Sequence, residues 1–124
     1  MQDKRHQLGR NSEKLAASYL KQKGYEILQH NYRTRQGEID IIARENHTIV
    51  FVEVKSRTST QFGHAVQALT QKQKVRLSKT ALTYLHINQL NNQSARFDVV
   101  AIQKDPKFGT DIRLIKNAFE FRLK

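Results

Sequence analysis

Several residue types that carry chemistry or shape a fold are missing from this sequence or rare in it. Its 124 residues include no cysteine, no tryptophan and one proline. Without cysteine there can be no disulfide, no thiolate metal ligand and no thiol nucleophile, and the composition fits a reducing compartment. The apolar stretches, such as 49–52, are far too short to span a bilayer, and residues 1–10 lack the apolar run of a secretory signal. We therefore expect a soluble, cytoplasmic protein with no membrane partner.

Acidic residues are scarce beside basic ones. The chain has 22 Lys and Arg against 11 Asp and Glu, a formal net charge of +11. Because clustered basic side chains release counterions from a phosphate backbone, nucleic acid is the expected partner. An anionic membrane is the rival, but it requires a basic amphipathic helix with bulky apolar anchors, and the most basic helical stretch has few. Charge that serves solubility alone is the simplest alternative.

Hydrophobic periodicity divides the chain into helices and strands. Residues 8–24 and 71–87 have the apolar spacing of amphipathic helices, and Thr70 is a plausible cap for the second. Strand patterns cover five segments. The first begins at Tyr25 and ends in the basic stretch 31–35, and the others are 38–43, 48–55, 97–102 and 111–115. The order predicts one α/β domain over residues 1–124, with a central mixed sheet of about five strands flanked by helices.

Two details of this prediction bear on the packing. The expected apolar stripe of the second helix consists of Val75, Leu77, Leu82 and Leu85. Gly37 is expected to interrupt the chain between the first two strands.

The two central strand patterns bring three charged side chains together. A hairpin centred on the turn at 46–47 places Asp40 directly opposite Glu53, and Lys55 shares the face of Glu53 because side chains alternate along a strand. A solvent-facing strip of an ordinary hairpin with one ion pair would have the same spacing. However, the carboxylates continue an apolar face on both strands, and half-buried charges seldom persist without a partner or a function.

These three side chains suit phosphate chemistry. Two carboxylates this close resist joint ionisation unless a cation neutralises them, and the set suits Mg²⁺ or Mn²⁺. Such an ion would polarise a phosphoryl oxygen, while Lys55 could position a water or stabilise charge on the pentacovalent phosphate. The constellation therefore predicts phosphodiester hydrolysis. The five histidines show no ligand spacing, so a zinc site is not expected.

The same residues carry a resemblance to a known group of nucleases. Gly37-Glu38-Ile39-Asp40 followed by Val52-Glu53-Val54-Lys55 resembles the D…ExK core of the PD-(D/E)xK nuclease superfamily. More closely, the chain resembles the YraN-like family, which is related to archaeal Holliday-junction resolvases. This match runs in order over nearly the whole chain through Gly9-Arg10 with Glu13, Asn31-Tyr32-Arg33, Gly37-Glu38-Ile39-Asp40, Phe51-Val52-Glu53-Val54-Lys55 with Arg57, and Arg96-Phe97-Asp98-Val99.

The resemblance implies a restriction-endonuclease-like fold and a Mg²⁺- or Mn²⁺-dependent endonuclease acting on nucleic acid. DNA is favoured over RNA, which stays open as a substrate, and branched or flap structures are candidate substrates. It implies that Asp40 and Glu53 ligate the metal, that the backbone carbonyl of Val54 adds a ligand and that Lys55 assists the nucleophilic water. Resolvase-like members also place a glutamate of the first helix in the site, and Glu13 is the matching position. On spacing alone Glu13 would be a solvated helix residue. The resemblance further implies a homodimer.

Other basic and polar residues are candidates for binding the nucleic acid. Arg33, Arg35 and Arg57 bracket the hairpin ends, where they could hold flanking phosphates. Lys72 and Gln73 lie in the first turn of the second helix, which suits phosphate binding. Surface solubility is the alternative for all five. The alternative for the whole protein is a non-catalytic nucleic-acid-binding module that keeps the nuclease fold.

Overall fold

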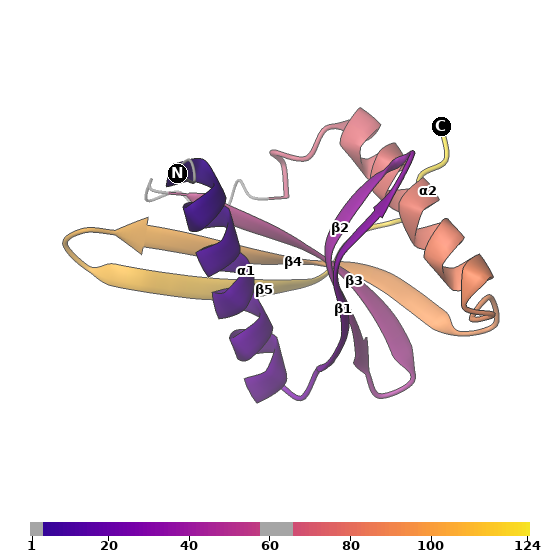
Figure 1. Cartoon of the computed structure of the whole chain (residues 1–124), viewed down its shortest axis with the longest axis horizontal. Helices are drawn as coiled ribbons and strands as arrows, with labels where there is room; N and C mark the ends of the chain where they lie inside the picture. The colour runs from indigo at the N-terminus through magenta and orange to yellow at the C-terminus, as the bar shows by residue number, and fades with distance from the viewer. Residues whose placement is uncertain (1–3, 58–65) are drawn as a thin grey trace.

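The computed structural model describes residues 4–57 and 66–124 (Figure 1). Two helices and five strands follow one another as α1 (Lys4–Gln22), β1 (Glu26–Thr34), β2 (Gly37–Glu45), β3 (Thr48–Arg57), α2 (Gln71–Ile87), β4 (Ser94–Asp105) and β5 (Gly109–Phe119). All seven expected elements are present, and α2 has the predicted bounds. The strands extend beyond the segments in which the apolar pattern is visible, because pairing with a neighbour continues into polar residues.

The five strands form one mixed sheet in the order β1-β2-β3-β4-β5. Neighbours are antiparallel except β3 and β4, which are parallel and are connected through α2. A parallel pair requires such a crossover, since a tight turn can only reverse the chain. The prediction of a single α/β domain with a mixed sheet of five strands and flanking helices is confirmed, and the architecture is consistent with a restriction-endonuclease-like fold.

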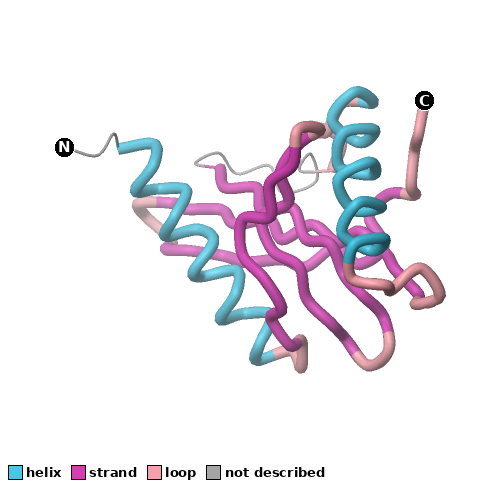
Figure 2. Tube along the Cα trace, turned by 45° about the vertical axis from the view of Figure 1, so that its right-hand side comes forward, coloured by secondary structure: helices cyan, strands magenta, loops and turns pink. Residues whose placement is uncertain are grey.

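Each face of the sheet is covered by one helix (Figure 2). On one face α1 contributes Ala16 and Leu20 to a buried cluster with Val50 and Val52. On the other face α2 covers a cluster whose largest members include Phe51, Leu77, Tyr84 and Phe97. Alternation along β3 therefore sends even-numbered apolar residues to α1 and odd-numbered ones to α2. Among the described residues, no helix has the length and apolar character needed to cross a membrane.

The packing of α2 differs from the expected stripe. Leu77 and Leu85 are buried, but Leu82 is 38% exposed and Val75 only half-buried. Ser78 and Thr80 are buried in their place, and each hydroxyl donates to the carbonyl four residues earlier, at 2.8 Å. These bonds allow the two hydroxyls to be buried, which hydrophobicity does not reveal. The prediction for Leu82 was wrong because burial on α2 depends on what the sheet presents to the helix.

Gly37 does not interrupt the chain but begins β2. A Cβ at this position would lie 3.1 Å from the Thr80 Oγ1 atom. The glycine therefore allows the start of β2 to approach α2 closely.

The two central strands pair over only part of their lengths. The β2–β3 ladder runs from Glu45↔Thr48 to Ile41↔Val52, in the predicted register. Beyond that point β2 is paired with β1, as at Ile39, while β3 continues alongside β4, as at Glu53. The sheet thus opens into a fork, with the β1–β2 hairpin on one side and β3–β5 on the other (Figure 1). The candidate site lies at this fork.

Candidate active site

Asp40 and Glu53 occupy the two sides of the fork. Asp40 precedes the last β2–β3 pair on β2, and Glu53 follows it on β3. The Val54 N–H donates to the Asp40 Oδ2 atom at 2.8 Å. The Val54 N–H has no backbone carbonyl of β2 to pair with, and the Asp40 carboxylate accepts its hydrogen bond instead. This bond holds Asp40 against β3. The predicted proximity of Asp40 and Glu53 follows from this arrangement, and the charge of Asp40 acts on the Glu53 carboxyl.

Lys55 is the third member of the group. Its Nζ atom lies 3.7 Å from the Glu53 Oε1 atom, and the two side chains are 24% and 18% exposed. Both residues follow Phe51 on the α2-facing side of β3, as alternation predicts. The solvent-facing strip considered above is therefore not what the structure contains, since the carboxylates and the ammonium are largely withdrawn from water.

Burial changes the protonation of the two carboxyls. Burial raises the pKa of Asp40 to about 6 against the opposing Val54 hydrogen bond, and the charges of Glu13 and Glu38 add to the increase. Burial also raises the pKa of Glu53 to about 8, as does the charge of Asp40, while Lys55 opposes the rise. Both carboxyls therefore favour the protonated form more strongly than carboxyls in water do. The site is short of positive charge.

Glu13 approaches from the opposite layer. It is half-buried on α1, and its charge contributes to the raised pKa of Asp40. Glu38 is exposed on β2, where its carboxylate is 3.3 Å from the Arg33 guanidinium. The electrostatic environment of Asp40 thus includes carboxylates from α1, β2 and β3.

A cavity of about 200 Å³ adjoins Glu53 on the α2 side. Its lining residues come from β2, β3, α2 and the segment before α2, and they are Gly37, Glu38, Glu53, Leu69, Gln73, Arg76 and Leu77. Gln73 therefore lies beside the carboxylate site, while its side-chain oxygen also accepts from the Thr70 N–H at 2.8 Å. Arg76, which borders the same cavity, was not among the candidates from the sequence.

The other predicted contacts lie around this centre rather than in it. Lys72 is exposed in the first turn of α2 and does not line the cavity. Arg33 and Arg35 are exposed at the end of β1 and in the turn that follows, and Arg57 is exposed at the end of β3. Basic side chains thus flank both arms of the fork.

The two carboxylates of the site are suitable ligands for a hard divalent cation, but they are only part of a complete ligand set. Asp40 and Glu53 provide two carboxylates whose repulsion and burial a dication would relieve, and oxygen is the donor atom that Mg²⁺ and Mn²⁺ prefer. Among the side chains that the structure describes, however, no three from His, Asp or Glu are grouped as a complete metal site. Further ligands would have to come from the Val54 carbonyl, from Glu13 after a movement, or from water and substrate.

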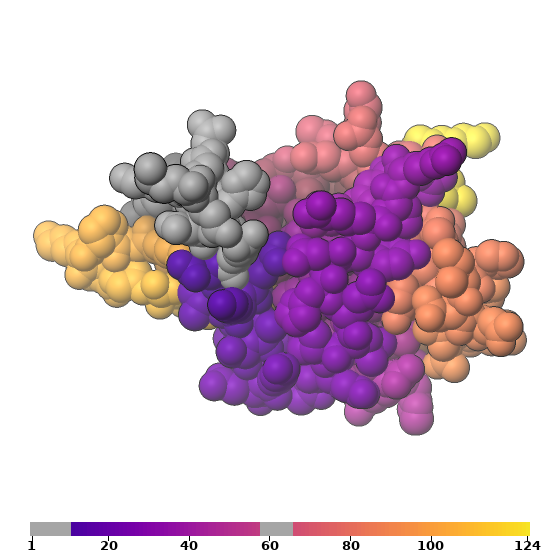
Figure 3. Space-filling view, viewed as in Figure 1, coloured from indigo at the N-terminus to yellow at the C-terminus, as the bar shows by residue number. Residues whose placement is uncertain are grey.

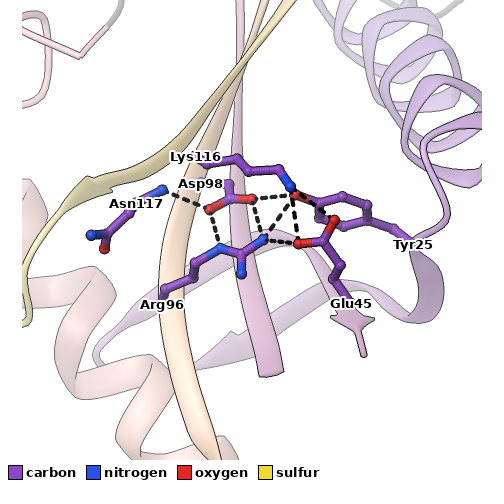
Figure 4. Close-up of polar contacts among 6 residues, drawn as sticks. All are labelled: Tyr25, Glu45, Arg96, Asp98, Lys116 and Asn117. Carbon is purple, nitrogen blue, oxygen red and sulfur yellow. Dashed lines mark hydrogen bonds and ion pairs between the residues drawn. The ribbon is translucent and has the colours of Figure 1, made fainter. Parts of the chain in front are cut away.

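A second polar cluster was not anticipated from the sequence (Figure 4). Asp98, fully buried on β4, accepts hydrogen bonds from the Tyr25 hydroxyl at 2.8 Å and the Arg96 Nε atom at 2.9 Å. Arg96 also donates to Glu45 at 2.6 Å, and Lys116 donates to the same carboxylate at 2.9 Å. These bonds lower the pKa of Glu45. The cluster thereby connects the residue before β1 with β2, β4 and β5.

Asn117 completes this cluster through its backbone. Its φ of 51° marks an irregularity in the β4–β5 ladder opposite Asp98, and its N–H donates to the Asp98 Oδ1 atom at 3.0 Å. The signal in the sequence was a single charged residue inside the apolar run 97–102, because a carboxylate at such a position needs partners. Of its partners, Arg96 is two residues away, whereas Tyr25 and Asn117 come from other parts of the chain.

The fold and the fork define a class: a small α/β domain of restriction-endonuclease-like architecture with a buried carboxylate pair between its central strands. Residues 12–102 match the uncharacterised protein family UPF0102, and the chain belongs to this family. A UPF0102 protein of Syntrophus aciditrophicus is 52% identical over 112 residues, covering 90% of this chain and 87% of the relative. One from Lachnoclostridium phytofermentans is 49% identical, covering 90% and 92%. One from Vibrio cholerae is 42% identical, covering 92% of each. The resemblance to the YraN-like family is thereby confirmed.

Proposed function

We propose that this protein is a metal-dependent endonuclease that hydrolyses phosphodiester bonds of DNA, with branched or flap structures as preferred substrates. The observation that carries the proposal is the convergence of Asp40, Glu53 and Lys55 in a largely buried position at the fork. A structural role alone does not account for two adjacent carboxylates whose pKa values are both raised, because such a pair destabilises the fold at neutral pH.

The roles follow from the chemistry of each group. Asp40 and Glu53 would hold Mg²⁺ or Mn²⁺, with the Val54 carbonyl and Glu13 as further ligands. When bound, the ion supplies charge neutralisation and polarises a phosphoryl oxygen. The Lys55 ammonium, 3.7 Å from Glu53, would orient a water molecule or stabilise negative charge on the phosphate in the transition state. Gln73, on the wall of the cavity, would contact the nucleotide beside the scissile bond.

Basic residues around the fork provide the binding surface in this proposal. Arg33, Arg35, Arg57 and Lys72 are exposed, and the chain carries a net charge of +11. Their charges would draw the phosphate backbone toward a centre that repels it until a cation is present.

The test is cleavage of a panel of duplex, flap and four-way-junction DNAs with Mg²⁺ or Mn²⁺. We expect cleavage by the wild type and its loss in Asp40→Asn, Glu53→Gln and Lys55→Met. Glu26→Gln removes a carboxylate that is 66% exposed on the same sheet, and it should cleave as the wild type does. The proposal fails if no substrate is cut, or if the Asp40 and Glu53 variants cut as well as the wild type.

A specific observation favours a second candidate, a non-catalytic nucleic-acid-binding module. In the described part of the chain the two site carboxylates are not joined by a third to make a complete metal site. Calorimetric titration with Mg²⁺ separates the candidates. Heat of binding in the wild type that disappears in Asp40→Asn supports the enzyme, whereas DNA binding without any metal binding supports the module.

A homodimer belongs to the proposal for junction substrates, because a single site cuts one strand at a time. Sedimentation equilibrium with and without a four-way junction tests it. We expect two chains on each junction. One chain on each junction would remove the dimer from the proposal and leave the chemistry intact.

A further inference from the structure

Phe108 stands out at the far end of the β4–β5 hairpin. With 81% of its surface exposed, it is the most exposed large hydrophobic side chain in the described part of the molecule, ahead of Ile87 at 66%. The hairpin projects from the body of the protein as a narrow arm (Figures 1 and 3). A single exposed apolar side chain is ordinary on a protein surface. The features around Phe108 are what distinguish it.

The turn that carries Phe108 is built to hold it in place. The Asp105 Oδ1 atom accepts hydrogen bonds from the Lys107 N–H at 2.7 Å and the Phe108 N–H at 3.1 Å. Pro106 restricts the backbone between them, and Gly109 adopts a φ of +86° that a side chain would disfavour. The ring is thus presented on an ordered turn, which lowers the entropic cost of using it in binding.

A cation accompanies the ring. The Lys107 Nζ atom lies 5.7 Å from the centroid of the Phe108 ring. Lys104 lies on the same tip, and the carboxylate of Asp105 is engaged within the turn. An aromatic face beside lysines suits an unpaired nucleotide, because the base can stack on the ring while an ammonium contacts the phosphate.

The arm extends from the candidate active site. Lys55 on β3 pairs with Ala101 on β4, and β4 continues to Asp105 before the turn. At about 3.3 Å per residue, the distance along the arm from Ala101 to Asp105 is about 13 Å. At about 3.4 Å per nucleotide of one duplex strand, the turn then lies roughly four or more nucleotides from the carboxylates. One nucleic acid molecule can therefore contact both places.

We infer that Phe108 stacks on an unpaired base of a nucleic acid whose neighbouring segment lies at the fork. The tip of the β4–β5 hairpin is thus a second contact site, selective for substrates with a single-stranded segment or an open duplex end. The inference rests on the proposed function only in taking nucleic acid as the partner. Neither cleavage nor a bound metal is required for it.

The chain has no tryptophan, so Phe108→Trp introduces a unique fluorescent reporter at the tip. The variant is titrated in EDTA with a single-stranded oligonucleotide, with a duplex closed by hairpins at both ends, and with vesicles of phosphatidylserine and phosphatidylcholine. We expect strong quenching by the single strand and little by the closed duplex. Ile87→Trp, at the end of α2, is the matched exposed control and should change little.

Each contrary outcome overturns the inference. Equal quenching of both reporters means that binding is not localised at the tip, and no quenching means that the ring does not stack. A blue shift with vesicles alone means that the tip contacts a membrane surface. Because these titrations contain no divalent metal, an inactive enzyme would not mimic any of these outcomes.

Two substitutions of Phe108 distinguish the effect of an aromatic ring from that of an apolar side chain. Phe108→Leu should weaken binding of the single strand by roughly 10-fold, whereas Phe108→Tyr should retain it, because stacking needs the π-face. Both variants should melt as the wild type does, since the side chain is exposed. If Phe108→Leu binds the single strand like the wild type, the inference is wrong.

Discussion

The carboxyl pair at the fork couples stability to pH. The raised pKa values, about 6 for Asp40 and about 8 for Glu53, lie above the ordinary values of 3.8 and 4.5. The folded protein therefore binds protons more tightly than the unfolded chain does. The stabilisation from these groups is complete below pH about 4 and is lost as the pH rises through 6 and 8.

Thermal unfolding between pH 5 and pH 9 tests this coupling. We expect the free energy of unfolding to fall over this range by on the order of 5 kcal/mol, with a flatter profile for Glu53→Gln. Mg²⁺ should raise the melting temperature of the wild type at pH 9 but not that of Asp40→Asn, because a cation needs both carboxylates. A wild-type profile as flat as that of Glu53→Gln would contradict the expectation.

The buried Asp98 stabilises the fold, unlike the carboxyl pair at the fork, because hydrogen-bond donors and a cation surround its carboxylate. Asp98→Asn should destabilise the protein by about 3 kcal/mol in urea unfolding, because it leaves the Arg96 guanidinium, 20% exposed, without its buried counter-charge. Glu26→Gln, which breaks an exposed ion pair at 3.7 Å, should cost less than about 1 kcal/mol. Equal costs for the two variants would show that the Asp98 cluster is not a stabilising element.

At the scale of elements, α2 connects local sequence signals with the site. Thr70 caps the helix by accepting from the Gln73 N–H at 3.0 Å, and the Gln73 side chain returns to the Thr70 N–H. The first turn of α2 then places Gln73 and Arg76 on the wall of the cavity beside Glu53.

Loss of this cap is expected to cost about 1 kcal/mol. Thr70→Ala should lower the melting temperature by about 4 °C, whereas Thr70→Ser should preserve it. Circular dichroism at a wavelength that reports helix content provides the measurement. Equal melting temperatures for Thr70→Ala and Thr70→Ser would show that the hydroxyl does not stabilise the helix.

The elements also show which parts of the fold could be predicted. The bounds of α2 and the register of the β2–β3 hairpin follow from signals a few residues apart, namely a cap, an apolar period and a two-residue turn. The full lengths of β4 and β5 did not follow from such local signals. Their polar ends form strands only because they pair with each other. Leu82 was misplaced for a related reason: burial on α2 depends on what the sheet presents to it.

For the whole molecule, the excess of positive charge is the dominant physical property. If Arg35 and Arg57 contact DNA phosphates, the logarithm of the affinity should fall with the logarithm of salt concentration at a slope of about −0.9 per contact. Arg35→Ala and Arg57→Ala should each reduce that slope by about 1, as measured by fluorescence anisotropy. Lys21→Ala, in the last turn of α1, is the matched basic control. If all three variants change the slope equally, binding is not directed to the fork.

The sequence by itself determined the α/β class, the family and the proximity of Asp40, Glu53 and Lys55, because these depend on periodicity, on ordered motifs and on one short hairpin. Only the tertiary structure decided that the site lies where β2 and β3 separate, since β2 stays with β1 while β3 stays with β4. The same holds for the approach of Glu13 from α1, the cavity beside Glu53, and the joining of Tyr25, Asp98 and Arg96. Each of these is a contact between segments far apart in the chain, formed only when both faces of the sheet are covered and all five strands are paired.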